Sequence, residues 1–149
     1  MTVSAICSHN VATIGAADDI VEAAIRMREA HVGDLIVVDS RTGLPIPIGI
    51  ITDRDIVVAV VAKKVGPETV KVGDAMSAQL LTVHEDNGVE FALREMRRVG
   101  VRRVPVVGEN RELVGVLSID DVIDHIAVQL GHIADVIRLE QAAETTTRS

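Results

Sequence analysis

The sequence predicts an α/β protein made of two copies of one unit, each with an extended start, a helix, two strands and a final helix. The chain repeats itself at a fixed offset. In both copies, apolar residues at the spacing of a helix are followed by a short run rich in β-branched residues. Of its 149 residues 48% are hydrophobic, yet Trp and Tyr are absent and Phe occurs once. Such an aliphatic core suits a sheet covered by helices and excludes a disordered chain.

The repeat appears when the sequence is shifted by 69 positions, which lays Val3–Val38 over Val72–Val107. Nine of these 36 positions are identical, and in the first copy they are Val3, Ser8, Thr13, Ala23, Met27, Arg28, Val32, Val37 and Val38. Copies of about 60 residues are marginal alone. We therefore expect the two units to bury their sheets against each other.

The helix of each copy is marked by apolar residues at a spacing of three and four. The positions are Ile20, Ala23, Ala24, Met27 and His31 in the first copy, and Val89, Ala92, Leu93, Met96 and Gly100 in the second, and all but the last of each series are apolar. The apolar runs that follow, Leu35–Val38 and Val104–Val107, are too short for helices and rich in β-branched residues. They predict strands.

Each copy ends with a strand that turns into a helix, GIITDRD (Gly49–Asp55) in the first and GVLSIDD (Gly115–Asp121) in the second. The first copy has three more residues in the preceding loop, which a surface connection absorbs. Gly66 and Pro67 mark a break between the copies. The predicted division is a first unit over 1–65, a linker over 66–71, a second unit over 72–130, and a helical extension with a frayed tail over 131–149.

The last helix is predicted to begin near Ile119 and to continue past the second unit. Its apolar seam, at spacings of four, three and four, consists of Ile126, Leu130, Ile133 and Ile137. Packing against its own unit and contact with a second copy of the chain both account for this seam. The tail AAETTTRS (142–149) is expected to fray.

Composition excludes several kinds of partner. The net charge of −7 argues against nonspecific binding to nucleic acid or anionic membranes, and single-stranded binding by stacking needs aromatic residues that are missing. The longest apolar stretch, Ile56–Ala62, is too short to span a bilayer, and no secretory signal is visible. The single cysteine, Cys7, aligns with the apolar Met76 and favours a reducing compartment. These observations predict a soluble, cytoplasmic protein.

The strand Val104–Val107 (VPVV) and the doubled G-h-h-[ST]-x-x-D turn, where h is apolar, resemble the CBS (cystathionine-β-synthase) domain family. Two such units in tandem resemble a CBS pair, or Bateman module, of the stand-alone bacterial type, over about residues 1–130. The resemblance implies two β-α-β-β-α units packed sheet to sheet with pseudo-twofold symmetry. It also implies two clefts, which bind adenosine-containing ligands in many members, and dimers of two pairs.

The two turns carry the candidate ribose ligands, Asp55 and Asp121, each one turn into its helix. A carboxylate there accepts hydrogen bonds from vicinal hydroxyls, while Thr52 and Ser118 are placed to donate to a phosphate at the helix start. The same T-x-x-D and S-x-x-D spacing is that of a capping box, in which hydroxyl and acid serve the helix itself. Both roles stay open at each turn. Gly49 and Gly115 leave room for a neighbouring backbone or an adenine ring.

The segment from Arg94 to Val107 has a net charge of +4, against −7 for the whole chain. Arg102 and Arg103, before the VPVV strand, and Arg54, in the first turn, are the basic candidate phosphate ligands. The resemblance implies that members that bind nucleotides have basic residues at the positions of Arg102 and Arg103. The matching residues of the first copy are Gly33 and Asp34. The Asp55 turn carries Arg54 where the Asp121 turn carries Asp120, so we expect phosphorylated ligand to prefer the Asp55 side.

Adenine is expected to lie between aliphatic side chains and backbone groups. The candidates are Val11, Thr13, Ile14, Leu80, Thr82, Val83, Pro105 and Val106. Ordinary packing is the alternative for each of them. The five histidines show no metal-ligand spacing, and no catalytic motif occurs.

The sequence therefore predicts a regulatory module, not an enzyme. It requires no cofactor, binds AMP, ADP or ATP (with Mg in the case of ATP), forms a homodimer, and acts on an effector protein in trans. The alternatives are a ligand-free structural or interaction module and a sensor of NAD or S-adenosylmethionine.

Overall fold

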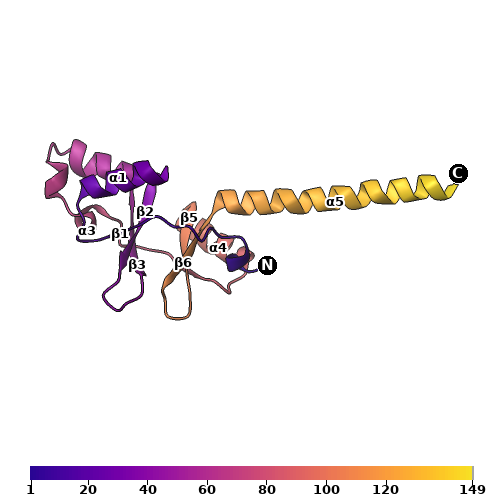
Figure 1. Ribbon diagram of the computed structural model, residues 1–149, viewed down its shortest axis with the longest axis horizontal. Coiled ribbons are helices and arrows are strands. Elements are labelled where there is room, and N and C mark those ends of the chain that lie inside the picture. Colours follow the sequence, from indigo (N-terminus) through magenta and orange to yellow (C-terminus); the bar gives the residue numbers. More distant parts are fainter. Residues whose placement is uncertain (149) are drawn as a thin grey trace.

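The computed structural model describes residues 1–148 and contains two three-stranded sheets with the same strand order, β1-β2-β3 and β4-β5-β6 (Figure 1). We call the part built on the first sheet the first unit and the part built on the second sheet the second unit. The predicted α/β class with its duplicated unit is confirmed.

The first unit has β1 (Thr13–Gly15) parallel to β2 (Asp34–Asp39), which pairs antiparallel with β3 (Ile46–Thr52). The parallel pair requires a crossover, and α1 (Ile20–Ala30) supplies it. This helix begins where the Asp19 carboxylate accepts a hydrogen bond from the Glu22 backbone N–H at 2.9 Å. The spacing of three and four between the apolar residues thus correctly predicts a helix in this segment.

The second unit repeats this arrangement with β4 (Val83–His84), α4 (Val89–Val99), β5 (Arg103–Val107) and β6 (Leu113–Ser118). Strand β4 is parallel to β5, and β5 is antiparallel to β6. The register shifts between Val106 and Val107, at the position that corresponds to the shift between Val37 and Val38. Even the irregularity is therefore duplicated.

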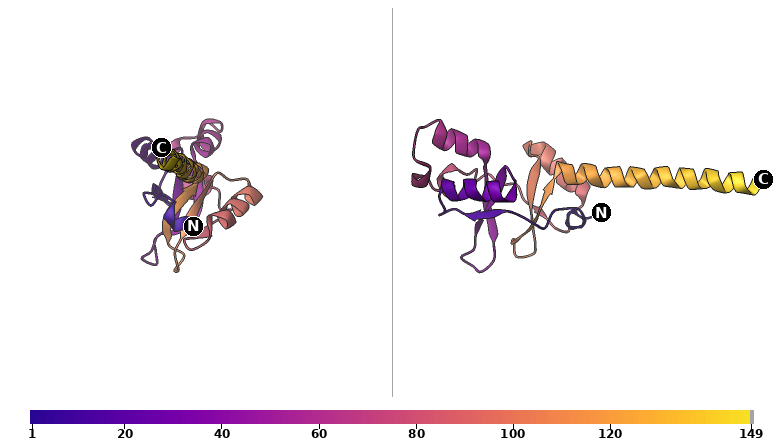
Figure 2. Two further views of the ribbon diagram at one scale, coloured as in Figure 1. Left: turned by 90° about the vertical axis from the view of Figure 1, so that its right-hand side faces the viewer. Right: turned by 45° about the horizontal axis from the view of Figure 1, so that its top comes forward.

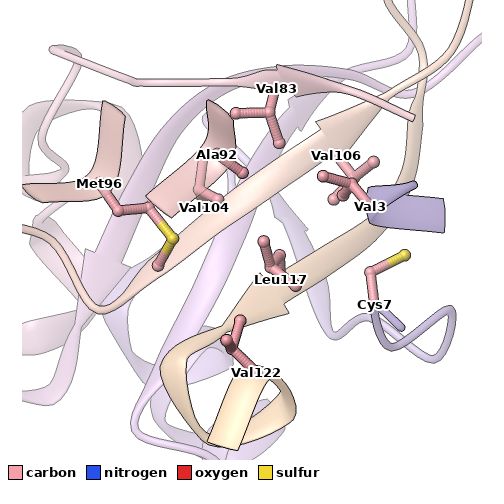
Figure 3. Close-up of a cluster of buried hydrophobic side chains, with 9 residues drawn as sticks. All are labelled: Val3, Cys7, Val83, Ala92, Met96, Val104, Val106, Leu117 and Val122. Atoms are coloured by element: carbon pink, nitrogen blue, oxygen red, sulfur yellow. The ribbon is translucent and has the colours of Figure 1, made fainter. Parts of the chain in front are cut away.

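The first residues of each copy pack into the other unit. Val3, in the short helix η1 (Val3–Ala5), and Cys7 belong to the core of the second unit, beside Val106 and Leu117 (Figure 3). Conversely, Val72, at the start of α3 (Val72–Ala75), belongs to the core of the first unit. The packing boundaries therefore differ from the boundaries drawn on the repeat.

Backbone contacts hold these exchanged segments in place. Ser8 bridges to Val116 of β6, and Ser77 bridges to Ile50 of β3. A Cβ at Gly49 would lie 2.8 Å from the Ser77 carbonyl oxygen, and one at Gly115 would lie 2.8 Å from that of Ser8. Of the two roles expected for these glycines, the structure shows the close approach of a backbone.

The two final helices differ in length. In the first unit α2 (Asp53–Ile56) runs into a π-helical segment, η2 (Val57–Val61), and the linker follows with η3 (Pro67–Thr69). In the second unit α5 (Ile119–Arg148) is a single helix of 30 residues. It leaves the body and projects along the long axis of the molecule (Figures 1 and 2).

Helix α5 differs from one sequence expectation and excludes one of the two explanations of its seam. The tail expected to fray is helical through Arg148. Within it, the hydroxyl of Thr145 donates a hydrogen bond to the Gln141 carbonyl at 2.9 Å. The seam does not pack against its own unit: Ile126 is 49% exposed, and the other three seam residues, Leu130, Ile133 and Ile137, are 51–61% exposed. No helix within residues 1–148 is long and apolar enough to cross a membrane.

Candidate functional site

A cleft of about 460 Å³ lies between the two units, at the start of both final helices. Its lining comes from both sheets and consists of Asp34, Ile50, Thr52, Val101, Arg102, Arg103, Ser118, Ile119 and Asp120. Asp34 pairs with Thr52 across β2 and β3, and Arg103 pairs with Ser118 across β5 and β6. The fold therefore brings equivalent positions of the two copies to one place.

Both turns form capping boxes. At the first, the Thr52 N–H donates to Asp55 Oδ2 at 2.9 Å, and the Asp55 N–H donates to Thr52 Oγ1 at 3.1 Å. At the second, the Ser118 N–H donates to Asp121 Oδ2 at 2.8 Å, and the Asp121 N–H donates to Ser118 Oγ at 3.1 Å. The capping role is thus present at each turn.

The ribose role of the two aspartates stays a prediction. Each aspartate uses Oδ2 for its cap, and Oδ1 of neither carboxylate accepts a hydrogen bond from within residues 1–148. Both residues are half-buried, just behind the turns that line the cleft. One oxygen of each carboxylate is therefore free to accept from a ligand hydroxyl.

Arg102, just before β5, and Arg103, the first residue of β5, both line the cleft, and each is near a carboxylate. Arg103 Nη1 lies 3.0 Å from Asp34 Oδ1 of the first unit. Arg102 Nη2 lies 3.9 Å from Asp120 Oδ1, where both side chains are more than 80% exposed. Two arginines and two aspartates thus line the cleft, and their charges balance.

Arg54 is exposed and is not part of the cleft lining. The extra positive charge expected on the Asp55 side therefore lies outside this cleft, whereas the extra negative charge of Asp120 lines it. The preference for the Asp55 side stays a prediction that rests on Asp120 alone.

The eight adenine candidates lie outside the lining of this cleft. The side chains of Ile14, Val83, Pro105 and Val106 are buried, three of them in the hydrophobic clusters of their units. Ordinary packing accounts for these four, so they offer a ligand no side-chain surface in this conformation. Val11, Thr13 and Leu80 are half-buried and Thr82 is exposed.

Sequence reasoning missed the apolar side chains that do line the cleft, Ile50, Val101 and Ile119. Each is within two residues of a predicted polar ligand, Thr52, Arg102 or Ser118. This adjacency is the signal that could have identified them. They supply the aliphatic surface that the missing aromatic residues cannot.

Two other features contribute no chemistry to the site. Burial, and to a smaller extent the Asp121 carboxylate, raises the pKa of the Cys7 thiol, so it behaves as a small core residue. Within residues 1–148 no group of three or more His, Cys, Asp or Glu is placed to hold a metal ion.

A family model described as "CBS domain" matches the chain twice, over residues 3–62 and 72–128. The uncharacterized protein MK0525 of Methanopyrus kandleri is 35% identical over 123 residues, which are 83% of this chain and 61% of that protein. The chain therefore spans less than two thirds of that relative's length.

Two solved structures resemble the fold closely. Hypoxic Response Protein I, solved with two coordinated zinc ions, has a TM-score of 0.72 and 31% identity over 84% of this chain and 98% of that chain; its curated counterpart is from Mycobacterium tuberculosis. The CBS domain pair of protein MJ0100, in complex with 5′-methylthioadenosine and S-adenosyl-L-methionine, has a TM-score of 0.73 and 27% identity, covering 87% of this chain and 98% of that chain.

Proposed function

The chain belongs to the CBS domain family as a tandem pair of CBS units, and we propose that it binds an adenosine nucleotide, AMP, ADP or ATP, between the units. The observation that carries the proposal is the cleft itself, which joins two helix starts, two arginines and three aliphatic side chains. The binding of two adenosine compounds by the MJ0100 pair supports this class of ligand.

Different residues of the cleft contact different parts of the ligand. Adenine lies against Ile50, Val101 and Ile119, because these are the apolar groups of the lining. The free Oδ1 atoms of Asp55 and Asp121 accept hydrogen bonds from ribose hydroxyls. The phosphate meets Arg102 and Arg103, with Thr52 and Ser118 at the helix starts, and Mg accompanies ATP.

A sensor of NAD or S-adenosylmethionine is the second candidate. The observation that favours S-adenosylmethionine is the pair of carboxylates, Asp34 and Asp120, that line the cleft beside the arginines. A carboxylate attracts a sulfonium or ammonium group and repels a phosphate. The two candidates therefore differ in the sign of charge that the cleft prefers.

The proposed role is regulatory and not catalytic. The cleft lining contains no histidine, cysteine or lysine, and the proposed effect of a bound nucleotide is to shift the relative populations of two arrangements of the units. The module acts in the cytoplasm on an effector protein in trans. A ligand-free structural module remains the contrasting proposal, and it expects no effect of any adenine compound on stability.

The homodimer is proposed to form through α5. Ile123, 56% exposed, extends the seam to five residues, and spacings of three and four from Ile123 to Ile137 are those of a coiled-coil a/d face. Five such side chains expose on the order of 500 Å² of apolar surface, so two helices bury about 1,000 Å² together, which a specific interface needs. An antiparallel pair keeps the acidic helix starts (Asp120, Asp121 and Asp124) of the two copies apart.

A thermal-shift titration tests the ligand proposal, with AMP, ADP, ATP, NAD, S-adenosylmethionine and adenosine added separately to the full chain. We expect at least one adenosine nucleotide to raise the melting temperature in a saturable way, because ligand binds only the folded state. A rise with S-adenosylmethionine alone would favour the second candidate. No rise with any compound would favour the ligand-free module.

A further inference from the structure

Asp34 and Arg103 occupy the same position in the two copies, 69 residues apart. Each is the first residue of its strand, β2 or β5, and each pairs with the residue that ends the next strand. In the structure they meet across the boundary between the units at 3.0 Å. The guanidinium that the sequence offers to a phosphate is thus already bound to a carboxylate of the other unit.

This ion pair is better protected than the second one in the cleft. The side chains of Arg103 and Asp34 are 40% and 21% exposed, against 81% and 82% for Arg102 and Asp120. Contact at 3.0 Å with reduced access to water makes a stronger pair than contact at 3.9 Å in solvent. Arg103 Nε is also buried and has no hydrogen-bond partner within residues 1–148. One donor of the guanidinium is therefore still unused.

A phosphate that approaches Arg103 meets Asp34 at the same guanidinium. It must either displace the carboxylate or share the cation with it, and two anions a few ångströms apart repel each other. The nucleoside part of the ligand carries no charge and meets no such opposition. Asp34 therefore weakens the contribution of the phosphate to the binding affinity and leaves the contribution of the adenosine part unchanged.

We propose that Asp34 is a specificity-determining residue, which lowers the preference of the cleft for phosphorylated over unphosphorylated adenosine ligands by competing for Arg103. This inference rests on the proposed function, because it concerns the same cleft. A chain with an uncharged residue in place of Asp34 would therefore bind nucleotides more tightly, and it would bind adenosine with unchanged affinity.

The test compares the affinities of AMP and adenosine, measured by isothermal titration calorimetry on the full chain, for the wild type and Asp34→Asn. Asparagine keeps the shape of the side chain and removes the charge. We expect AMP to bind about threefold to tenfold more tightly to the variant, and adenosine to change less than twofold. Asp34→Ser is the second variant, with the same expectation, if the asparagine variant does not fold.

The matched control is Asp39→Asn at the other end of β2. Asp39 also forms an ion pair, with Arg41 at 2.6 Å, and its loss removes the same charge from the same strand outside the cleft. We expect this control to leave the ratio of the AMP and adenosine affinities unchanged. An unchanged ratio in the Asp34 variants overturns the role of Asp34 while the proposed function stands. If neither compound binds wild type or variants, the proposed function fails and the inference with it.

Discussion

The two units of this chain share their strand order, register and capping boxes, yet they differ at the first residue of the second strand and in the final helix. The pseudo-twofold arrangement brings the equivalent residues Asp34 and Arg103 into contact. Two aspartates or two arginines at this point would repel, so the difference between the copies makes this contact between the units attractive. The site combines residues that the copies share in type and position, such as Thr52 and Ser118, with residues that differ between them, Asp34 and Arg103.

The final helices show the same contrast on a larger scale. In the first unit the helix is α-helical only over Asp53–Ile56, whereas α5 continues for 30 residues. The extension has no contact with the body that would bury its seam, and the exposed side chains are left for another molecule. The duplicated sequence therefore sets the two cores, and the part beyond the repeat carries the exposed seam on which the proposed homodimer depends.

The largest effect is expected from breaking the seam of α5. Replacement of both Leu130 and Ile133 by Asp places charges in the apolar face, and we expect the proposed homodimer to become a monomer at micromolar concentration. Light scattering coupled to gel filtration measures the mass. Val128→Asp is the control, because Val128 is 55% exposed on the same helix but lies outside the seam. A monomeric wild type, or a dimeric double variant, would contradict pairing through this helix.

A smaller effect is expected from truncating the exchanged core residues. Val3 and Val72 are equivalent and fully buried, and each lies in the core of the other unit. We expect Val3→Ala and Val72→Ala each to lower the free energy of unfolding by about 1–3 kcal/mol. Hydrogen exchange should then rise mainly in β5 and β6 for Val3→Ala, and mainly in β2 and β3 for Val72→Ala. The reverse pattern would show that each segment stabilises its own copy.

The smallest effect compares the two turns. Asp55→Ala and Asp121→Ala each remove one capping box, so we expect similar losses of stability, about 0.5–2 kcal/mol. For AMP, ADP and ATP we expect Asp55→Ala to lose about tenfold in affinity and Asp121→Ala less, because Asp120 opposes phosphate beside the second turn. Chemical denaturation measures the losses of stability, and calorimetric titration measures the losses of affinity. A larger loss for Asp121→Ala would reverse the assignment.

Much of the fold could be predicted from local patterns. The strands and helices of both copies follow from spacing and β-branched runs, and the two turns follow from a seven-residue motif that occurs twice. The polar residues of the cleft, Thr52, Ser118, Arg102 and Arg103, were found because they stand at the ends of such elements. The apolar residues of the cleft lining, Ile50, Val101 and Ile119, were not found, because alternation within a strand does not tell which face meets a cleft and which meets the core. Ile14 and Val106, for example, lie in the cores of the two units.

The sequence by itself determined the duplicated unit, the order of its elements, the capping boxes and the start of the last helix near Ile119, because these depend on residues within a few positions of one another. Only the tertiary structure decided the rest. It placed Val3 in the second core and Val72 in the first, joined Asp34 to Arg103, and left Leu130 exposed. Each of these results depends on how elements far apart in the chain pack against one another. The physical reason is that burial and ion pairing are properties of the packed whole, which local spacing does not contain.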